Sequence, residues 1–249
     1  MLKQERHNLI MKEINFHNKV ISTDLTALLK VSNDTIRRDL KELADNEQIL
    51  KIHGGAISKP LITFSKENNQ VYAQEAKQHI AEKTIKLFTD NMVIIIGGGT
   101  TMIEVAEKIP DNLKATFYTI SPQVAITLAK HENLEVITIG GRLEKSSNSH
   151  TGASVINQLS EIKADLGVMG SNAFSMQYGL SDMDWETVQV KKAILRSSKK
   201  VAVLSIFEKL NISQRIKICN IDNVDYLITE LKPDVAILSS YHKSNLVLL

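Results

Sequence analysis

Six short apolar runs, separated by helix-like segments, occupy the chain from about residue 92 onward and restrict its possible folds. Most of these runs are nearly continuous in apolar residues instead of alternating with polar ones. This composition is typical of parallel strands covered by helices on both faces. The predicted strands span residues 92–96, 115–119, 134–139, 166–170, 200–205 and 225–229. The pattern predicts an α/β fold with a mostly parallel sheet.

The first 57 residues have a different pattern, with short helical periodicities followed by a brief alternating stretch. With 249 residues, of which 43% are hydrophobic, the chain is long enough for two domains with cores of their own. We predict a first domain over residues 1–57 and a second over residues 71–249. Residues 58–70 contain Pro60 and a polar cluster, as a linker does.

Composition excludes several classes of protein and site. The single cysteine, Cys219, cannot form an intramolecular disulfide, and we expect it to be a small packed side chain. Charged residues interrupt every apolar run near the N-terminus, so we expect no signal peptide and no membrane span. A cytoplasmic protein is therefore expected. The net charge of +2 is too small to indicate nucleic-acid binding by itself.

Three helices are predicted before residue 47. We expect Ser22 to be the N-cap of the second helix and Ser32 that of the third. The apolar positions expected to face the core are Leu9, Ile10, Ile14 and Phe16 in the first helix, Leu25, Leu28 and Leu29 in the second, and Ile36, Leu40 and Leu43 in the third. Two short helices joined by a tight turn, at residues 22–46, predict a helix-turn-helix.

The outward face of the third helix is polar and basic. Arg38 and Lys41 lie opposite Ile36 on the helical repeat, and Arg37 lies at its flank. Arginine can read guanine edges in the major groove, while hydroxyls and helix N-terminal amides can bind phosphates. After this helix, apolar Leu50 and Ile52 alternate with polar side chains before a glycine turn, which predicts a β wing. The predicted DNA contacts are Ser22, Thr23, Ser32, Asn33, Thr35, Arg37, Arg38, Lys41, Lys51 and His53.

Charge alone favours another interpretation, in which Arg37 and Arg38 belong to a solvated helix face beside Asp39 and Glu42. Residues 1–57 contain nearly equal numbers of basic and acidic side chains. However, "VSNDTIRRDLKEL" followed by "ILKIHGGA" closely resembles the N-terminal signature of the DeoR family of transcriptional regulators, as does "QERHNLI" before it. In that family the stretch spans the recognition helix and the wing. The resemblance implies that double-stranded operator DNA is a partner.

Polar loops follow the first three predicted strands of the second domain. The carboxyl ends of parallel strands share one edge of a sheet, where ligands bind. Glycines allow backbone amides to approach an anion, hydroxyls donate hydrogen bonds, and Arg142 can add a bidentate contact. These loops predict a phosphate pocket. The effector contacts predicted from these loops are Gly97, Gly98, Gly99, Thr100, Thr101, Ser121, Gly141 and Arg142. The resemblance to the DeoR family, which continues in this half of the chain, implies Gly152 and Lys191 as further contacts.

Each of these glycine loops, taken alone, is as typical of a tight turn as of a phosphate-binding loop. The loop at residues 97–101 lacks the lysine of a P-loop and the spacing of a dinucleotide site. The DeoR resemblance continues through G-T-T, Gly152, "YGLSDMDWETVQVKKAIL" and "YLITE". Family members look similar in this half to ribose-5-phosphate isomerase and CoA-transferase-like folds. The resemblance implies a repressor of a sugar-metabolism operon that senses a phosphorylated sugar effector.

An enzyme of the sugar-phosphate isomerase type, with an N-terminal DNA-binding appendage, is the alternative interpretation. Gly97 and Ile206 stand where the family commonly has acids, whereas Lys209 keeps the family's base. A general base at the loops is therefore missing, and we predict no catalytic residue, cofactor or metal. We expect Trp185 to serve core or helix packing and His150 to lie in a surface loop, with a place at the pocket as the alternative for each. We also expect a homo-oligomer, because one helix-turn-helix covers only a half-site.

Overall fold

The computed structural model describes residues 1–17, 19–46, 48–58, 72–243 and 245–249. These residues form two compact units whose division falls close to residue 72. The predicted linker, residues 58–70, lies outside the described residues except for Ser58, which ends a strand. The predicted domain boundaries at residues 57 and 71 remain predictions.

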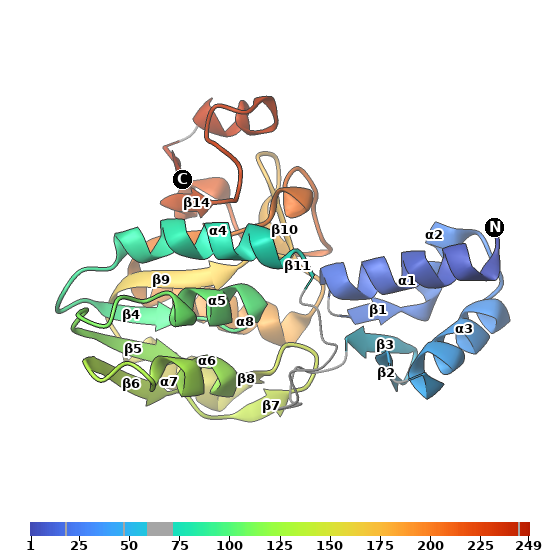
Figure 1. The fold of residues 1–249 in the computed structure, drawn as a ribbon, viewed down its shortest axis with the longest axis horizontal. Coiled ribbons are helices and arrows are strands. Elements are labelled where there is room, and N and C mark those ends of the chain that lie inside the picture. The colour runs from blue at the N-terminus through green and yellow to red at the C-terminus, as the bar shows by residue number, and fades with distance from the viewer. Residues whose placement is uncertain (18, 47, 59–71, 244) are drawn as a thin grey trace. The chain divides into compact units, whose positions relative to one another are not determined.

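The first unit contains three helices and a three-stranded antiparallel sheet in its described part (Figure 1). Its elements are α1 (Lys3–His17), β1 (Lys19–Ile21), α2 (Ser22–Leu29), α3 (Asn33–Asp45), β2 (Ile49–Ile52) and β3 (Gly55–Ser58). Strand β3 lies between β1 and β2. The predicted helix-turn-helix and wing are present, and β1 is a third strand that the sequence pattern did not predict.

The core of the first unit is formed by side chains from all three helices and all three strands. Its members are Ile10, Ile14, Val20, Leu25, Leu29, Ile36, Leu40, Leu43, Ile49 and Ala56. Two predicted core positions are wrong, because Leu9 and Leu28 are 42% and 55% exposed. Each is directly next to a buried apolar residue in sequence, and in each pair the neighbour is the one that faces the core.

The second unit is built on a seven-stranded parallel sheet in the part of the chain that the structure describes. Its strands are β4 (Val93–Ile96), β5 (Ala115–Thr119), β6 (Leu134–Thr138), β9 (Ala164–Gly170), β12 (Ser198–Leu204), β14 (Tyr226–Ile228) and β15 (Val247–Leu248). Their order across the sheet is β15-β14-β12-β9-β4-β5-β6, and every neighbouring pair is parallel. All six predicted strands are therefore confirmed.

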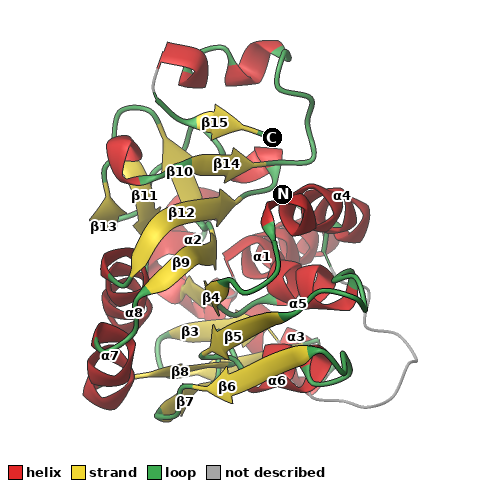
Figure 2. Ribbon diagram, turned by 90° about the vertical axis from the view of Figure 1, so that its left-hand side faces the viewer, coloured by secondary structure: helices red, strands yellow, loops and turns green. Residues whose placement is uncertain are grey.

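Helices cover both faces of this sheet (Figure 2). Helices α4 (Gln74–Thr84), α5 (Thr100–Glu107) and α6 (Pro122–Leu128) lie on one face, and α7 (Ala153–Ser160) and α8 (Trp185–Arg196) lie on the other. The interior strand β4 consequently has no solvated face, and Ile94, Ile95 and Ile96 are fully buried. This burial explains the continuous apolar run in the sequence.

Smaller elements surround the main sheet. Strands β7 (Arg142–Glu144) and β8 (Ser149–Thr151) form a hairpin, and β10 (Ala173–Ser175), β11 (Gly179–Asp182) and β13 (Ile216–Cys219) form an antiparallel sheet. Short 3-10 helices span Ile85–Leu87, Phe207–Lys209, Ile221–Asn223, Ala236–Leu238 and Tyr241–Lys243. Cys219 is buried as predicted, and burial raises the pKa of its thiol to about 11.

Two further observations bear on the sequence predictions. Trp185 is 61% exposed at the start of α8, so the prediction that it packs in the core is wrong. Its position explains the exposure, since a side chain in the first helical turn lies at the end of the helix.

Among the described residues, no helix is both long and apolar enough to cross a membrane.

Candidate functional site

Helix α3 presents one buried face and one exposed polar face. Ile36, Leu40 and Leu43 are buried in the core of the first unit, as predicted. The side chains of Asn33, Arg37, Arg38 and Lys41 are exposed, and Thr35 is half-buried. The helix therefore offers a continuous polar surface with three cations, as a helix that enters the major groove does.

The two predicted N-caps differ in outcome. Ser32 caps α3, because its Oγ accepts a hydrogen bond from the Thr35 amide at 3.3 Å. Ser22 is instead the first residue inside α2, which has no side-chain cap, so that prediction is wrong. The Ser22 amide donates to the Gly54 carbonyl at 2.8 Å, and the side chain is buried. Neither group is free for the predicted phosphate contact, whereas Thr23 is exposed.

The wing is formed by β2 and β3 with a turn at Gly54, whose φ of 76° favours glycine. Lys51 and His53 are exposed on it, as a contact with the DNA backbone requires. Together, the exposed groups of α3, Thr23 and the wing form the candidate DNA surface of the first unit.

In the second unit, the loop after β4 presents a series of unpaired backbone donors. Gly97 is held to the sheet, since its amide donates to the Val168 carbonyl at 2.8 Å. In the described part of the chain, the amides of residues 98–101 donate no hydrogen bond. Gly99 takes φ 103° as the N-cap of α5, a conformation that residues with a side chain rarely adopt. Free amides at a helix N-terminus form an anion-binding site.

The loops after β4 and β5 approach each other closely at Gly98. A methyl group at this position would overlap Ser149 Oγ and would lie 3.3 Å from Ser121 Cβ. Ser121 caps α6 and is buried, with its Oγ 3.5 Å from the Val124 amide. The missing side chain of Gly98 is therefore what allows the two loops and β8 to meet, and Ser149 joins the site although the sequence pattern did not indicate it.

The loop after β6 is joined to this group through His150. The amide of Gly141 donates to His150 Nδ1 at 2.7 Å, and the His150 amide donates to the Ile120 carbonyl at 2.8 Å. His150 is half-buried in strand β8, so the prediction of a surface loop is wrong. Gly152 follows as the N-cap of α7 with φ 102°, nearly the conformation of Gly99. Arg142 is exposed in β7, and its contact with a phosphate remains a prediction.

A second polar group lies beyond the ends of β9, β11 and β12. Asp182 is 2% exposed, and its carboxylate accepts hydrogen bonds from Lys191 Nζ at 2.7 Å and from Asn172 Nδ2 at 2.9 Å. Lys209 Nζ in turn donates to Asn172 Oδ1 at 3.3 Å. Burial alone would raise the pKa of Asp182, but Lys191 and these hydrogen bonds hold it below its usual range. Asp182 is thus an ionised anchor that fixes Lys191 and Asn172.

Three lysines concentrate positive charge around this anchor. Burial, together with repulsion from Lys77 and Lys191, lowers the pKa of Lys209 to about 7 against the attraction of Asp182. Burial likewise lowers the pKa of Lys77 to about 8 against the attraction of Glu104 in α5. An arrangement in which buried ammonium groups repel one another is stabilised when an anion binds between them. We call Lys77, Lys191 and Lys209 the lysine cluster.

Ser171 lies at the same sheet edge, directly after β9. Its side chain is 6% exposed, and its Oγ has no hydrogen-bond partner within the described residues. A buried hydroxyl without a partner costs free energy unless a ligand or water completes it. Because β9 lies between β4 and β12, Ser171 lies between the free amides of residues 98–101 and the loop that holds Lys209.

The sequence pattern found only part of this edge. Gly98, Ser121, Gly141 and Gly152 come together with Ser149 and His150, whereas Lys191 belongs to the group around Asp182. Lys77 was missed because it lies on α4, remote in sequence from any strand end. Its burial in a helix that begins at Gln74 gave no periodic signal. Lys209 was noticed only through the resemblance to the DeoR family, as the position that keeps the family's base.

Comparison with protein-family models identifies two matches. Residues 6–60 match the model described as the DeoR-like helix-turn-helix domain, and residues 72–231 match the model described as the DeoR C terminal sensor domain. The first match covers α1 to β3, and the second covers α4 to β14.

Similar curated proteins match over nearly their whole length. The HTH-type transcriptional regulator GolR of Listeria innocua is 29% identical over 99% of this chain and 98% of its own. The glycerol-3-phosphate regulon repressor of Escherichia coli is 27% identical over 96% of this chain and 95% of its own. Among solved structures, ribose 5-phosphate isomerase A of Methanocaldococcus jannaschii aligns with a TM-score of 0.40 and 18% identity, over 55% of this chain and 54% of its own.

Substitution of Gly98 tests whether the loops after β4, β5 and β6 bind an anion. We expect Gly98→Ala to weaken binding of phosphorylated sugars by at least about tenfold, because the new methyl group displaces Ser149 or the loop. Binding is measured as the rise in melting temperature on adding each compound of a sugar-phosphate panel. Gly140→Ala is the matched control, since nothing lies within 4 Å of a methyl group there. Equal ligand shifts in both variants would contradict the assignment.

The lysine cluster predicts a pH dependence of anion binding. Below pH 7, the side chains of Lys209 and Lys77 are mostly charged before an anion binds. Above their pKa values of about 7 and 8, these two lysines must take up protons when the anion binds. We expect affinity for a sugar phosphate to fall by at least about tenfold between pH 7 and pH 9, a range in which phosphate itself is almost fully ionised. Titration calorimetry in two buffers of different ionisation enthalpy measures the proton uptake.

The Lys209→Met variant should bind more weakly and lose most of this pH dependence. Lys199→Met is the control, because Lys199 is exposed and pairs with Asp165 at 2.8 Å instead. A pH profile that stays unchanged in Lys209→Met would show that the cluster does not titrate with the ligand.

Proposed function

Because this chain belongs to the DeoR family of transcriptional regulators, we propose that it represses a sugar-metabolism operon by binding double-stranded operator DNA through α3 and the wing. We also propose that a phosphorylated sugar binds at the carboxyl edge of the parallel sheet and changes the affinity for DNA. The observation that carries the second proposal is that the free amides of residues 98–101 and the lysine cluster lie at the same edge of the sheet.

The first unit supports the DNA half of this proposal by the exposure of its cations. Arg37, Arg38 and Lys41 project from one surface of α3, and Lys51 projects from the wing. Exposed basic groups on the second helix of a helix-turn-helix contact base edges and phosphates. The small net charge of the chain is consistent with this role, because a few cations on one surface are enough to bind DNA.

The second unit supports the sensor half by the chemistry of its donors. A phosphate dianion is matched by free amides, hydroxyls and ammonium groups, and a sugar offers hydroxyls to a carboxylate such as Asp182 and an amide such as Asn172. The name of one relative, the glycerol-3-phosphate regulon repressor, indicates that a small phosphorylated compound is relevant to that protein. We propose a compound of this class here.

We propose binding without turnover at this site. The positions at which the family commonly has acids supply no carboxylate, since Gly97 is a sheet-bound glycine and Ile206 is a buried apolar residue. Asp182 has a lowered pKa and is ion-paired with Lys191, whereas an effective general base has a pKa raised toward neutrality. The arrangement therefore favours holding an anion over abstracting a proton.

Substitution of Arg38 tests the DNA half. We expect Arg38→Ala to weaken binding to a specific duplex by about tenfold or more, the loss that follows removal of one base contact of roughly 1–3 kcal/mol. The duplex is selected from a random pool by repeated binding to the wild-type protein, and affinity is measured by gel shift. Arg196→Ala, at an exposed arginine in the last turn of α8, is the control. Unchanged affinity in Arg38→Ala would refute this assignment.

The same gel-shift titration tests the coupling between the units. A sugar phosphate that raises the melting temperature should change the affinity of the wild-type protein for the selected duplex, because a ligand shifts a conformational equilibrium by its differential affinity for the two states. Gly98→Ala should keep its DNA affinity and lose this response. A ligand that binds tightly and leaves DNA affinity unchanged would remove the sensor half of the proposal.

We infer oligomerisation from the short DNA segment that one helix-turn-helix can contact. One helix-turn-helix reads a short half-site, so specific binding generally needs two or more copies. We propose a homo-oligomer whose contacts are made by the second unit. Light scattering is expected to give a mass of at least twice 27.8 kDa for the free chain or for its DNA complex. A monomer in both conditions would contradict the proposal.

A further inference from the structure

Helix α3 contains a buried acid, Asp39, between residues that are assigned to DNA. Asp39 is 3% exposed, although it follows the exposed Arg38 directly in sequence. A buried carboxylate in a helix that approaches phosphates is costly in two ways, through lost hydration and through repulsion of the DNA. A partner must therefore compensate it.

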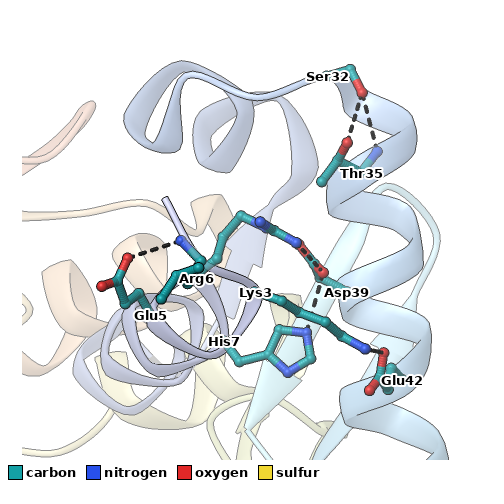
Figure 3. A network of polar contacts seen from close by, with 9 residues as sticks. Lys3, Glu5, Arg6, His7, Ser32, Thr35, Asp39 and Glu42 are labelled. Atoms are coloured by element: carbon teal, nitrogen blue, oxygen red, sulfur yellow. Dashed lines mark hydrogen bonds and ion pairs between the residues drawn. The ribbon is translucent and has the colours of Figure 1, made fainter.

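Helix α1 supplies the compensation from two adjacent residues (Figure 3). Arg6 donates to Asp39 through both Nε and Nη2, and the Nη2 contact with Oδ1 is 2.9 Å long. His7 Nε2 lies 3.2 Å from the same oxygen. Burial raises the pKa of Asp39, but the hydrogen bonds from Arg6 and His7 outweigh it and hold the pKa below its usual range. The hydrogen bond to Asp39 also raises the pKa of Arg6.

The bidentate contact restricts rotation of α3 more than apolar packing does. A planar guanidinium and a carboxylate share two hydrogen bonds only in a narrow range of orientations. At about 100° per residue, Arg37 and Lys41 both lie roughly 160° from Asp39, on the opposite side of the helix. The contact with α1 therefore sets the direction in which these two cations project.

A small rotation would be enough to disturb base reading. At the side-chain radius of about 5–6 Å, turning α3 by about 20° moves these groups by roughly 2 Å. Bidentate recognition tolerates displacements of only about 0.5 Å. Contacts with phosphates are less sensitive, because they depend mainly on charge.

We propose that the contact of Arg6 and His7 with Asp39 is a positioning element for DNA reading, which fixes the rotation of α3 and thereby sets specificity for base sequence. These residues act through Arg37, Arg38 and Lys41 and need no contact with DNA themselves. This inference rests on the proposed DNA-binding function of α3. It concerns how selective binding is achieved, and the general attraction of the protein for DNA does not depend on it.

A second ion pair between the same helices provides an internal control. Lys3 contacts Glu42 one turn further along α3, but both side chains are largely solvent-exposed, at 57% and 44%. Flexible exposed pairs of this kind contribute little to stability and restrict orientation weakly. Loss of Lys3 should therefore leave α3 in place, even though it removes a positive charge from the same region.

The experiment compares the full-length Asp39→Asn, Arg6→Lys and Lys3→Ala variants with the wild-type protein. Affinity is measured for two duplexes of equal length and composition: one selected from a random pool by the wild-type protein, and its scrambled version. Asp39→Asn keeps the shape but removes the charge, and Arg6→Lys keeps the charge but removes the bidentate geometry. Thermal unfolding and the salt dependence of binding are recorded for each variant.

We expect Asp39→Asn and Arg6→Lys to lose about tenfold or more in affinity for the selected duplex, as when a base contact is misplaced. Affinity for the scrambled duplex should stay within about twofold with an unchanged salt slope, because phosphate contacts are kept. Lys3→Ala should leave the affinity for the selected duplex and the affinity for the scrambled duplex unchanged relative to each other. If Asp39→Asn does not fold, Arg6→Lys decides the question.

Two results would overturn the positioning role. One is a parallel loss of affinity for both duplexes that follows the fall in melting temperature, which indicates a purely structural contact. The other is unchanged discrimination in Asp39→Asn and Arg6→Lys while Arg38→Ala still weakens selective binding, which leaves the proposed function intact. Failure of the wild-type protein to enrich any duplex refutes DNA reading itself and is therefore distinguishable from both.

Discussion

Burial of the parallel strands on both faces is the constraint on which the second unit depends. Helices cover the two faces of the sheet, so strands such as β4 and β9 are almost entirely apolar. Polar groups can then gather only where strands end. Because all seven strands of the described sheet are parallel, the loops after β4, β5, β6, β9 and β12 open at one edge. The fold thus concentrates donors for an anion in the loops at this edge, while the core positions of the strands stay apolar.

The edge combines two kinds of donor with different properties. The amides of residues 98–101 are fixed by the backbone and carry no titratable proton, so they attract an anion at any pH. In the lysine cluster, burial lowers the pKa of Lys77 and Lys209, so the charge of these two side chains depends on pH. Asp182 holds Lys191 and Asn172 in place at this edge. We propose that a site of this kind binds an anion without abstracting a proton from it.

The first unit solves a different physical problem with a much smaller core. Helix α3 must pack against α1 and α2 through one face while its opposite face stays polar for DNA. Apolar contacts of Ile36, Leu40 and Leu43 hold the helix in the unit but allow some rotation, because they are not directional. Directional bonds from Arg6 to the buried Asp39 add the orientation that apolar packing lacks.

The sequence by itself determined six strands of the parallel sheet, the helix-turn-helix, the wing and the glycine loops, because each depends on local periodicity or on a short motif. The sequence pattern predicted the wrong environment for Leu9, Leu28, Trp185 and His150, since neighbouring positions on a helix or strand differ in burial only once partners are packed. Tertiary structure alone decided that Asp39 is buried against Arg6, that Ser149 meets Gly98, and that Lys77 joins Lys209. These pairs are distant in sequence and come together by chain folding, which no local pattern records.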